Sequence, residues 1–212
     1  MYYFKEIEQE ARKILLNIGK SHDWEHTLRV LNLCMKIASV EKADLDVLKL
    51  SAVLHDVARE EEDKVKGEIC HAELGAKIAF EILKKYNVDK FMINKVCHCI
   101  ETHRFKGNKK PESLEAKILF DADKLDAIGA IGLARAFVYS GEIGAKVHNI
   151  NSKIDETLPY TEEDTAYREY YFKLRYIKDK LFTTTGKLIA EERHKFMVGF
   201  FDRLNKEVEG EV

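Results

Sequence analysis

The spacing of apolar residues is the feature that most restricts what this chain can fold into. Over long stretches these residues recur every three or four positions, and no segment of useful length alternates apolar with polar residues. The first pattern places apolar side chains on one face of an α-helix, whereas alternation is typical of a half-buried strand. Only two prolines, Pro111 and Pro159, interrupt the chain. The sequence therefore predicts an all-α fold: a helical bundle with a C-terminal helical extension.

Short polar residues mark where several of these helices should begin. Ser21 or Asp23 is expected to cap the second helix, and Asp44 or Asp46 the third. Ser113 is expected to cap the sixth, because such side chains accept hydrogen bonds from the unpaired N–H groups of a first turn. The predicted helices span residues 2–18, 24–40, 45–56, 71–86, 89–102, 113–138, 164–182 and 187–208.

One long stretch, residues 139–163, lacks helical spacing. Long loops in compact domains often serve as lids or substrate loops. We therefore expect residues 1–140 to form a domain that carries the functional site. Residues 141–212 should form a loop and a helical extension packed on it, within the same domain or as a small lobe.

The composition excludes several classes of protein. The chain has 212 residues, 45% hydrophobic and 34% charged, which is the balance of a globular protein rather than a disordered one. No apolar run could cross a bilayer and no secretion signal is recognisable, so we expect a cytoplasmic protein without a membrane partner. The net charge of -2 gives no electrostatic reason to bind a nucleic acid polymer. Without a C-x-x-C pair, the four cysteines are interpreted as reduced thiols: Cys34, Cys70, Cys97 and Cys99.

A histidine and an aspartate stand side by side at the end of an apolar run, in the stretch AVLHDVARE. On their own, His55 and Asp56 could form only a helix-ending turn. Upstream, however, His26 lies in the first turn of a predicted helix whose following turns are apolar. The short link 41–44 favours antiparallel packing of the two helices, which would bring His26 to the His55–Asp56 pair.

Three aspartates occur within one apolar helix, in the stretch FDADKLDAIGA: Asp121, Asp123 and Asp126. Acids on such a helix cost free energy unless they are paired or bind a cation. Asp123 and Asp126 share a face because they lie three residues apart. Two imidazoles and two carboxylates make a mixed nitrogen and oxygen site, which suits Mn, Fe, Ni, Co or Zn better than Mg or Ca. A divalent transition metal is therefore the expected cofactor.

The order of these motifs resembles that of the HD superfamily of metal-dependent phosphohydrolases. SHDWEHTLRV, VLHDVA and DADKLDAIGAIGLAR look like its small single-domain branch, over residues 20–140 and more weakly beyond them. The resemblance implies that His26, His55 and Asp56 are metal ligands and that Asp123 is the fourth. Asp121 and Asp126 are the competing assignments, and otherwise would hydrogen-bond the ligands or form a salt bridge between helices.

The resemblance also points to side chains around the metal. Binuclear members of the superfamily carry additional histidines at places comparable to those of His71 and His103. We interpret these two as pocket residues that bind phosphate or assist proton transfer, and His98 as a core or surface histidine. One metal ion is expected, and a binuclear site stays open. His22 and Asp23 are expected to support the ligands, although Asp23 could equally be only a helix cap.

The proton donor for a leaving group is less well marked. Related nucleotidases carry an acid shortly after the His-Asp pair, but here Arg59 occupies that place and Glu60, Glu61 and Glu62 follow. Arg59 is expected to hold phosphate, because the guanidinium fork matches phosphate oxygens. Glu60 is a candidate acid, although a run of glutamates is typical of a solvated loop. Lys124, inside the aspartate helix, would neutralise a substrate or a carboxylate.

These inferences lead to a hypothesis of function. The chain is expected to hydrolyse phosphoester or phosphoanhydride bonds, with a nucleotide as the favoured substrate and a metal-bound water as the attacking group. The candidate catalytic residues are Asp56, Glu60 and His103. One alternative, motivated by Arg59, is a sensor that binds metal and nucleotide without turnover, and another is a purely structural helical protein. A homodimer is left open.

Overall fold

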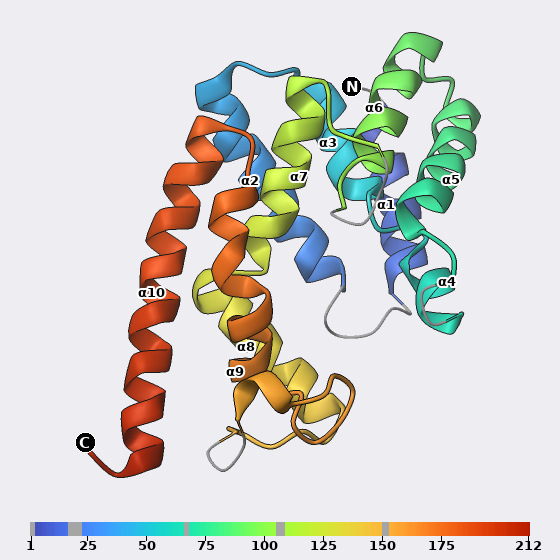
Figure 1. The fold of residues 1–212 in the computed structure, drawn as a ribbon. Helices are drawn as coiled ribbons and strands as arrows, with labels where there is room; N and C mark the ends of the chain where they lie inside the picture. The colour runs from blue at the N-terminus through green and yellow to red at the C-terminus, as the bar shows by residue number, and fades with distance from the viewer. Residues whose placement is uncertain (1–2, 17–22, 66–67, 105–108, 150–152) are drawn as a thin grey trace. The chain divides into compact units, whose positions relative to one another are not determined.

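The computed structural model describes residues 3–16, 23–65, 68–104, 109–149 and 153–212, and within these ranges its regular elements are all helices (Figure 1). The predicted all-α fold is therefore confirmed. The chain divides into two compact units, Met1–Asp123 and Lys124–Val212. The expected domain boundary near residue 140 stays a prediction.

A central buried helix organises the first unit. Helix α3 packs against α1, α2 and α6, while α5 packs against α6 and α4. The side chains of α3 from Val47 to Leu54 are almost all fully buried, because this helix is apolar around most of its circumference. The elements of this unit are α1 (Phe4–Leu15), α2 (Trp24–Glu41), α3 (Leu45–Leu54), α4 (Arg59–Lys64), α5 (His71–Lys85), α6 (Lys90–Glu101) and most of α7 (Leu114–Asp126).

The helix starts follow the predicted capping residues. Asp23, Asp44 and Ser113 each accept a hydrogen bond from a backbone N–H of the following first turn, at distances between 3.0 and 3.3 Å. Asp44, rather than Asp46, caps α3. Ser21 lies outside the described residues. The cap at Asp23 fixes the start of α2, which is the end of that helix that bears on the site.

In the second unit α8 packs against α9 and α10, and the 3-10 segment η3 packs against both α9 and α10. Two predicted boundaries are wrong here. The helix expected over 164–182 is a short α-helix followed by a 3-10 segment, and α8 extends into the stretch expected to be irregular. The elements are α8 (Gly129–Glu142), η2 (Ile154–Glu156), α9 (Ala166–Phe172), η3 (Leu174–Lys180) and α10 (Thr184–Glu209).

The single helix predicted over 113–138 is also wrong, because the chain turns between α7 and α8. Ile128 is extended, and Gly129 adopts a φ of 78°, which is costly for any residue with a Cβ. A Cβ at Gly132 would lie 2.3 Å from the backbone oxygen of Ala127. The glycines of this stretch therefore allow a tight turn, which ends α7 shortly after Asp123.

No helix among the described residues combines the length and the apolar character that a membrane crossing requires.

Replacing Gly132 by alanine is expected to lower the free energy of unfolding by about 3 kcal/mol, because the new methyl group would overlap the backbone of Ala127. Gly141, also in α8, is the matched control: apart from its chain neighbours and the backbone of its own helix, no described atom lies within 4 Å of its Cβ position. Gly141→Ala should leave stability unchanged or raise it by about 0.5–1 kcal/mol, since alanine favours helix. Urea unfolding of both variants measures the difference, and equal losses would contradict this account of the turn.

Candidate metal centre

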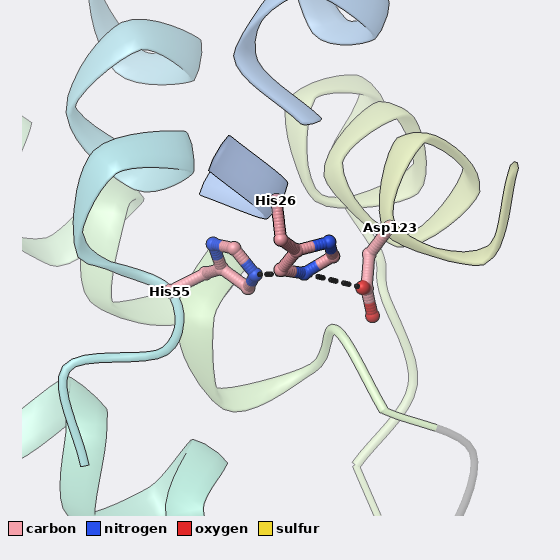
Figure 2. A group of neighbouring side chains, drawn as sticks. All are labelled: His26, His55 and Asp123. Carbon is pink, nitrogen blue, oxygen red and sulfur yellow. Dashed lines mark hydrogen bonds and ion pairs between the residues drawn. The ribbon is translucent and has the colours of Figure 1, made fainter. Parts of the chain in front are cut away.

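Three side chains from separate helices of the first unit meet at one place (Figure 2). His26 comes from the first turn of α2, His55 directly follows the last residue of α3, and Asp123 lies near the end of α7. His26 Nε2 is 3.3 Å from His55 Nε2 and 3.5 Å from Asp123 Oδ1. The packing of α2 on α3 therefore brings the start of one helix to the end of the next, as their short link predicted.

Asp56 lies between this group and a second one. Its Oδ2 is 3.4 Å from His55 Nε2 and 3.7 Å from His26 Nε2. Its Oδ1 is 3.4 Å from His71 Nε2 and 3.7 Å from His103 Nε2. The described residues thus offer two groups of possible metal ligands, His26–His55–Asp123 and Asp56–His71–His103, each with its ligand atoms within 4.8 Å of one another.

The two groups are almost entirely shielded from solvent. His26 and His55 are 0% exposed, and the exposed fractions of Asp56, His71 and His103 are at most 4%. Only the Asp123 side chain keeps appreciable contact with solvent, at 16%. Buried imidazoles and carboxylates are retained in a protein interior when they are hydrogen-bonded, paired or bound to a metal, so this much buried polarity in one place indicates a functional centre.

Backbone hydrogen bonds orient two of the histidines. His55 Nδ1 donates to the carbonyl of Ala52 at 2.8 Å, and His103 Nδ1 donates to the carbonyl of Ile100 at 2.6 Å. A carbonyl oxygen only accepts, so the proton of each neutral ring lies on Nδ1 and the lone pair lies on Nε2. Both rings therefore direct an unprotonated nitrogen at Asp56, in the form that coordinates metal ions.

Burial favours the neutral forms of His55 and His71. Desolvation lowers the pKa of His55 from its ordinary value, and it lowers the pKa of His71 to about 4 although the neighbouring Asp56 opposes this shift. Burial opposes ionisation of Glu62 too, but hydrogen bonds from His71 and Arg104 outweigh it and lower the pKa of that carboxyl. At neutral pH both histidines are thus free to act as ligands, and Glu62 is a carboxylate.

The three aspartates of α7 have different surroundings. Asp123 belongs to the first group of ligands. Asp126 is buried and pairs with Arg135 at 2.8 Å, and the same guanidinium also donates to the Asp126 carbonyl. Asp121 is fully buried and belongs to neither group. Lys124 follows Asp123 on α7 and is half-buried.

The other predicted site residues are dispersed. Asp23 caps α2 by accepting from the backbone N–H of His26 at 3.0 Å, so it steadies the turn that carries this histidine. Glu60 pairs with Lys64 at 2.8 Å on an exposed face of α4. His98 accepts from the backbone N–H of Glu112, as expected for a histidine outside the site. His22 lies outside the described residues.

Glu62 and Arg104, to which the sequence analysis assigned no role, border the second group. Glu62 is buried on α4, where its Oε2 contacts His71 Nδ1 and its Oε1 accepts from Arg104 Nη1 at 2.7 Å. Arg59 Nη1 lies 3.5 Å from the same carboxylate. The run of glutamates is therefore a short helix rather than a solvated loop. The spacing of Arg59 and Glu62, three residues apart, was the available sign that both lie on one face.

Acidification is expected to destabilise the metal-depleted protein. Because His71 has a pKa of about 4 in the folded state against an ordinary 6.5, the unfolded chain binds more protons between these values. The neutral His71 side chain therefore makes its full contribution to the free energy of unfolding above about pH 6.5. This contribution decreases as the pH is lowered toward 4. Urea unfolding at about pH 7 and about pH 5 in chelator measures the loss. The loss of stability should be smaller in His71→Gln, whereas His98→Gln should lose as much as the wild type. Equal losses in the wild type and both variants would contradict the prediction.

Comparisons with known proteins agree with the motifs. A model of the HD domain matches residues 23–128, which contain both groups of ligands. An uncharacterized protein of Bacillus subtilis strain 168, YpgQ, is 35% identical over 210 residues, which cover 97% of this chain and 94% of YpgQ.

Solved structures resemble the chain over nearly its whole length. The crystal structure of YpgQ in complex with ADP superposes with a TM-score of 0.73 at 28% identity, over 97% of this chain and 95% of that one. The crystal structure of an HD-superfamily hydrolase from Bacillus thuringiensis superposes with a TM-score of 0.77 at 28% identity, over 98% and 97%. The resemblance inferred from the motifs is confirmed, and this chain belongs to the HD domain family.

Proposed function

We propose that this protein is a metal-dependent phosphohydrolase that cleaves a phosphoester or phosphoanhydride bond of a nucleotide. The observation that carries the proposal is the convergence of His26, His55, Asp56 and Asp123 in a buried centre. Hydrolysis is supported by the likeness to an HD-superfamily hydrolase, and a nucleotide substrate by the likeness to YpgQ, which was crystallised with ADP.

The first group fits a divalent transition metal. It combines imidazole nitrogens with carboxylate oxygens, and this mixed set suits Mn, Fe, Ni, Co or Zn better than an all-oxygen cage would. His26, His55, Asp123 and Oδ2 of Asp56 would hold the ion. When bound, such a metal lowers the pKa of a coordinated water and polarises a P–O bond.

The second group supports either of two roles. His71 Nε2 and His103 Nε2 are only 3.1 Å apart. If both rings carry their proton on Nδ1, these facing nitrogens both present lone pairs, and a cation between them and Asp56 Oδ1 would relieve the repulsion. We extend the proposal to a second divalent ion here, which Asp56, His71 and His103 would hold. In the alternative, one of the two rings takes up a proton and donates it to a phosphate oxygen or a leaving group.

Two basic side chains next to members of these groups, Arg59 and Lys124, would bind the phosphate. Arg59 lies 3.4 Å from His71 through its Nη1, and its side chain keeps 24% of its surface exposed. A guanidinium at the border of a buried centre would offset the negative charge that develops during phosphoryl transfer. Lys124, next to Asp123 on the same helix, is the other candidate for this role. In the alternative without a second ion, His103 is a better candidate proton donor than Glu60, which is engaged with Lys64.

A sensor that binds metal and nucleotide without turnover is the second candidate function. It is favoured by the position of Glu60, which pairs with Lys64 on α4. Glu60 was the candidate proton donor, and turnover would need such a donor. The same centre would then hold the nucleotide in place without releasing a product.

Asp56→Ala is expected to abolish both metal retention and turnover, because this carboxylate contacts both groups of ligands. His148→Ala is the control and should leave both near the wild-type level, since His148 belongs to the second unit and pairs there with Asn205. Elemental analysis of purified protein gives the metal and its stoichiometry, which distinguishes one ion from two. Full metal occupancy in Asp56→Ala would show that the ligand assignment is wrong.

A panel of nucleotides tests the reaction directly. We expect hydrolysis of at least one nucleoside mono-, di- or triphosphate or cyclic nucleotide in the presence of Mn, Co or Ni, with loss of turnover on chelation and recovery when metal is restored. Released phosphate, pyrophosphate and nucleoside are quantified separately, because each identifies a different cleaved bond. Tight nucleotide binding without any product would instead support the sensor.

A further inference from the structure

The histidine His71 differs from its neighbours in how its outer nitrogen is held. His55 and His103 each donate from Nδ1 to the carbonyl three residues earlier, those of Ala52 and Ile100. His71 is the first residue of α5, so no helical turn precedes it and no carbonyl of its own helix is available. Its Nδ1 therefore depends on a partner from another segment.

Glu62 on α4 is that partner. Its Oε2 contacts His71 Nδ1, and a carboxylate can only accept, so the histidine nitrogen donates. Arg59 Nη1 lies 3.4 Å from the same nitrogen, but it is a donor that also lies 3.5 Å from Glu62 Oε2. If Nδ1 instead accepted from Arg59, its lone pair would face the carboxylate at close contact.

The surroundings of Glu62 keep it in place. The residue is 6% exposed, and its second oxygen accepts from Arg104 Nη1 at 2.7 Å, a charge-assisted bond to the residue after His103. Two guanidinium groups, those of Arg59 and Arg104, therefore balance the charge of the buried carboxylate. The carboxylate thereby links α4 to the start of α5, which carries His71, and to the segment after α6, which carries His103.

We propose that Glu62 is a positioning residue that holds the proton of His71 on Nδ1 and so turns an unprotonated Nε2 toward Asp56 and His103. The inference rests on the proposed function, in which this nitrogen faces the reacting centre. Glu62 belongs to neither group of possible ligands, and the member of the second group that it contacts is His71. Removing a carboxylate that orients a ligating histidine in this way typically lowers metal affinity or activity 10–100-fold.

The tautomer of His71 is the direct test. Imidazole ¹⁵N spectra of the full-length protein, recorded as purified and again with Zn²⁺, show which ring nitrogen carries the proton, and His71→Gln identifies the signals. We expect His71 to be protonated at Nδ1 in the wild type and in Glu62→Gln, whose amide oxygen still accepts. In Glu62→Met, which keeps a similar length but has no acceptor oxygen, the Nδ1 proton should be lost, and Zn²⁺ affinity should fall about 10-fold or more.

Glu61→Ala is the matched control on the same helix. Its carboxylate is 45% exposed and lies 3.9 Å from Lys64, so neither the tautomer nor Zn²⁺ affinity should change. A wild-type His71 protonated at Nε2, or a Glu62→Met protein that keeps the Nδ1 proton, would overturn the inference. If Glu62→Met does not fold, the wild-type spectrum still tests the inference, because it shows which nitrogen of His71 carries the proton. Because the tautomer is measured without substrate, an absence of turnover would count against the proposed function and not against Glu62.

Discussion

The buried carboxylate of Asp56 is the constraint on which the rest of the centre depends. Its two oxygens face imidazoles from four different segments, and the residue is only 3% exposed. A carboxylate in such an interior requires nearby positive charge or hydrogen bonds. Burial lowers the pKa values of His55 and His71, so at neutral pH these rings supply lone pairs rather than charge. A divalent cation would suit a carboxylate and neutral imidazoles together.

The packing of α3 explains how the positions of His55 and Asp56 are fixed. This helix is buried along most of its length and ends directly at His55, so the positions of His55 and Asp56 follow from the packing of apolar side chains against α1, α2 and α6. Interiors are packed at the density of organic crystals and resist small displacements. These two candidate ligands thus lie in the turn directly after a buried helix, so the packed core fixes their positions, as in a preorganised site.

Local signals in the sequence predicted much of this. Apolar spacing indicated an all-α fold, and the order of His26, His55–Asp56 and Asp123 indicated a site that the structure brings together. The turn at Gly129 was missed because a glycine in an apolar helical pattern does not reveal a positive φ. The burial of Glu62 was missed because three consecutive glutamates look alike in sequence, and only the packing of α4 on α5 distinguishes them.

The different hydrogen-bond partners of the three histidine Nδ1 atoms determine which substitutions each ring orientation can tolerate. The carbonyls of Ala52 and Ile100 persist whatever side chains occupy those positions, so the orientations of His55 and His103 tolerate any substitution that the core can accommodate. His71 has no such protection, because its anchor is a side chain that one codon change can delete. Among these three imidazoles, it is the one through which mutation could adjust the reactivity of the centre while the helices stay where they are.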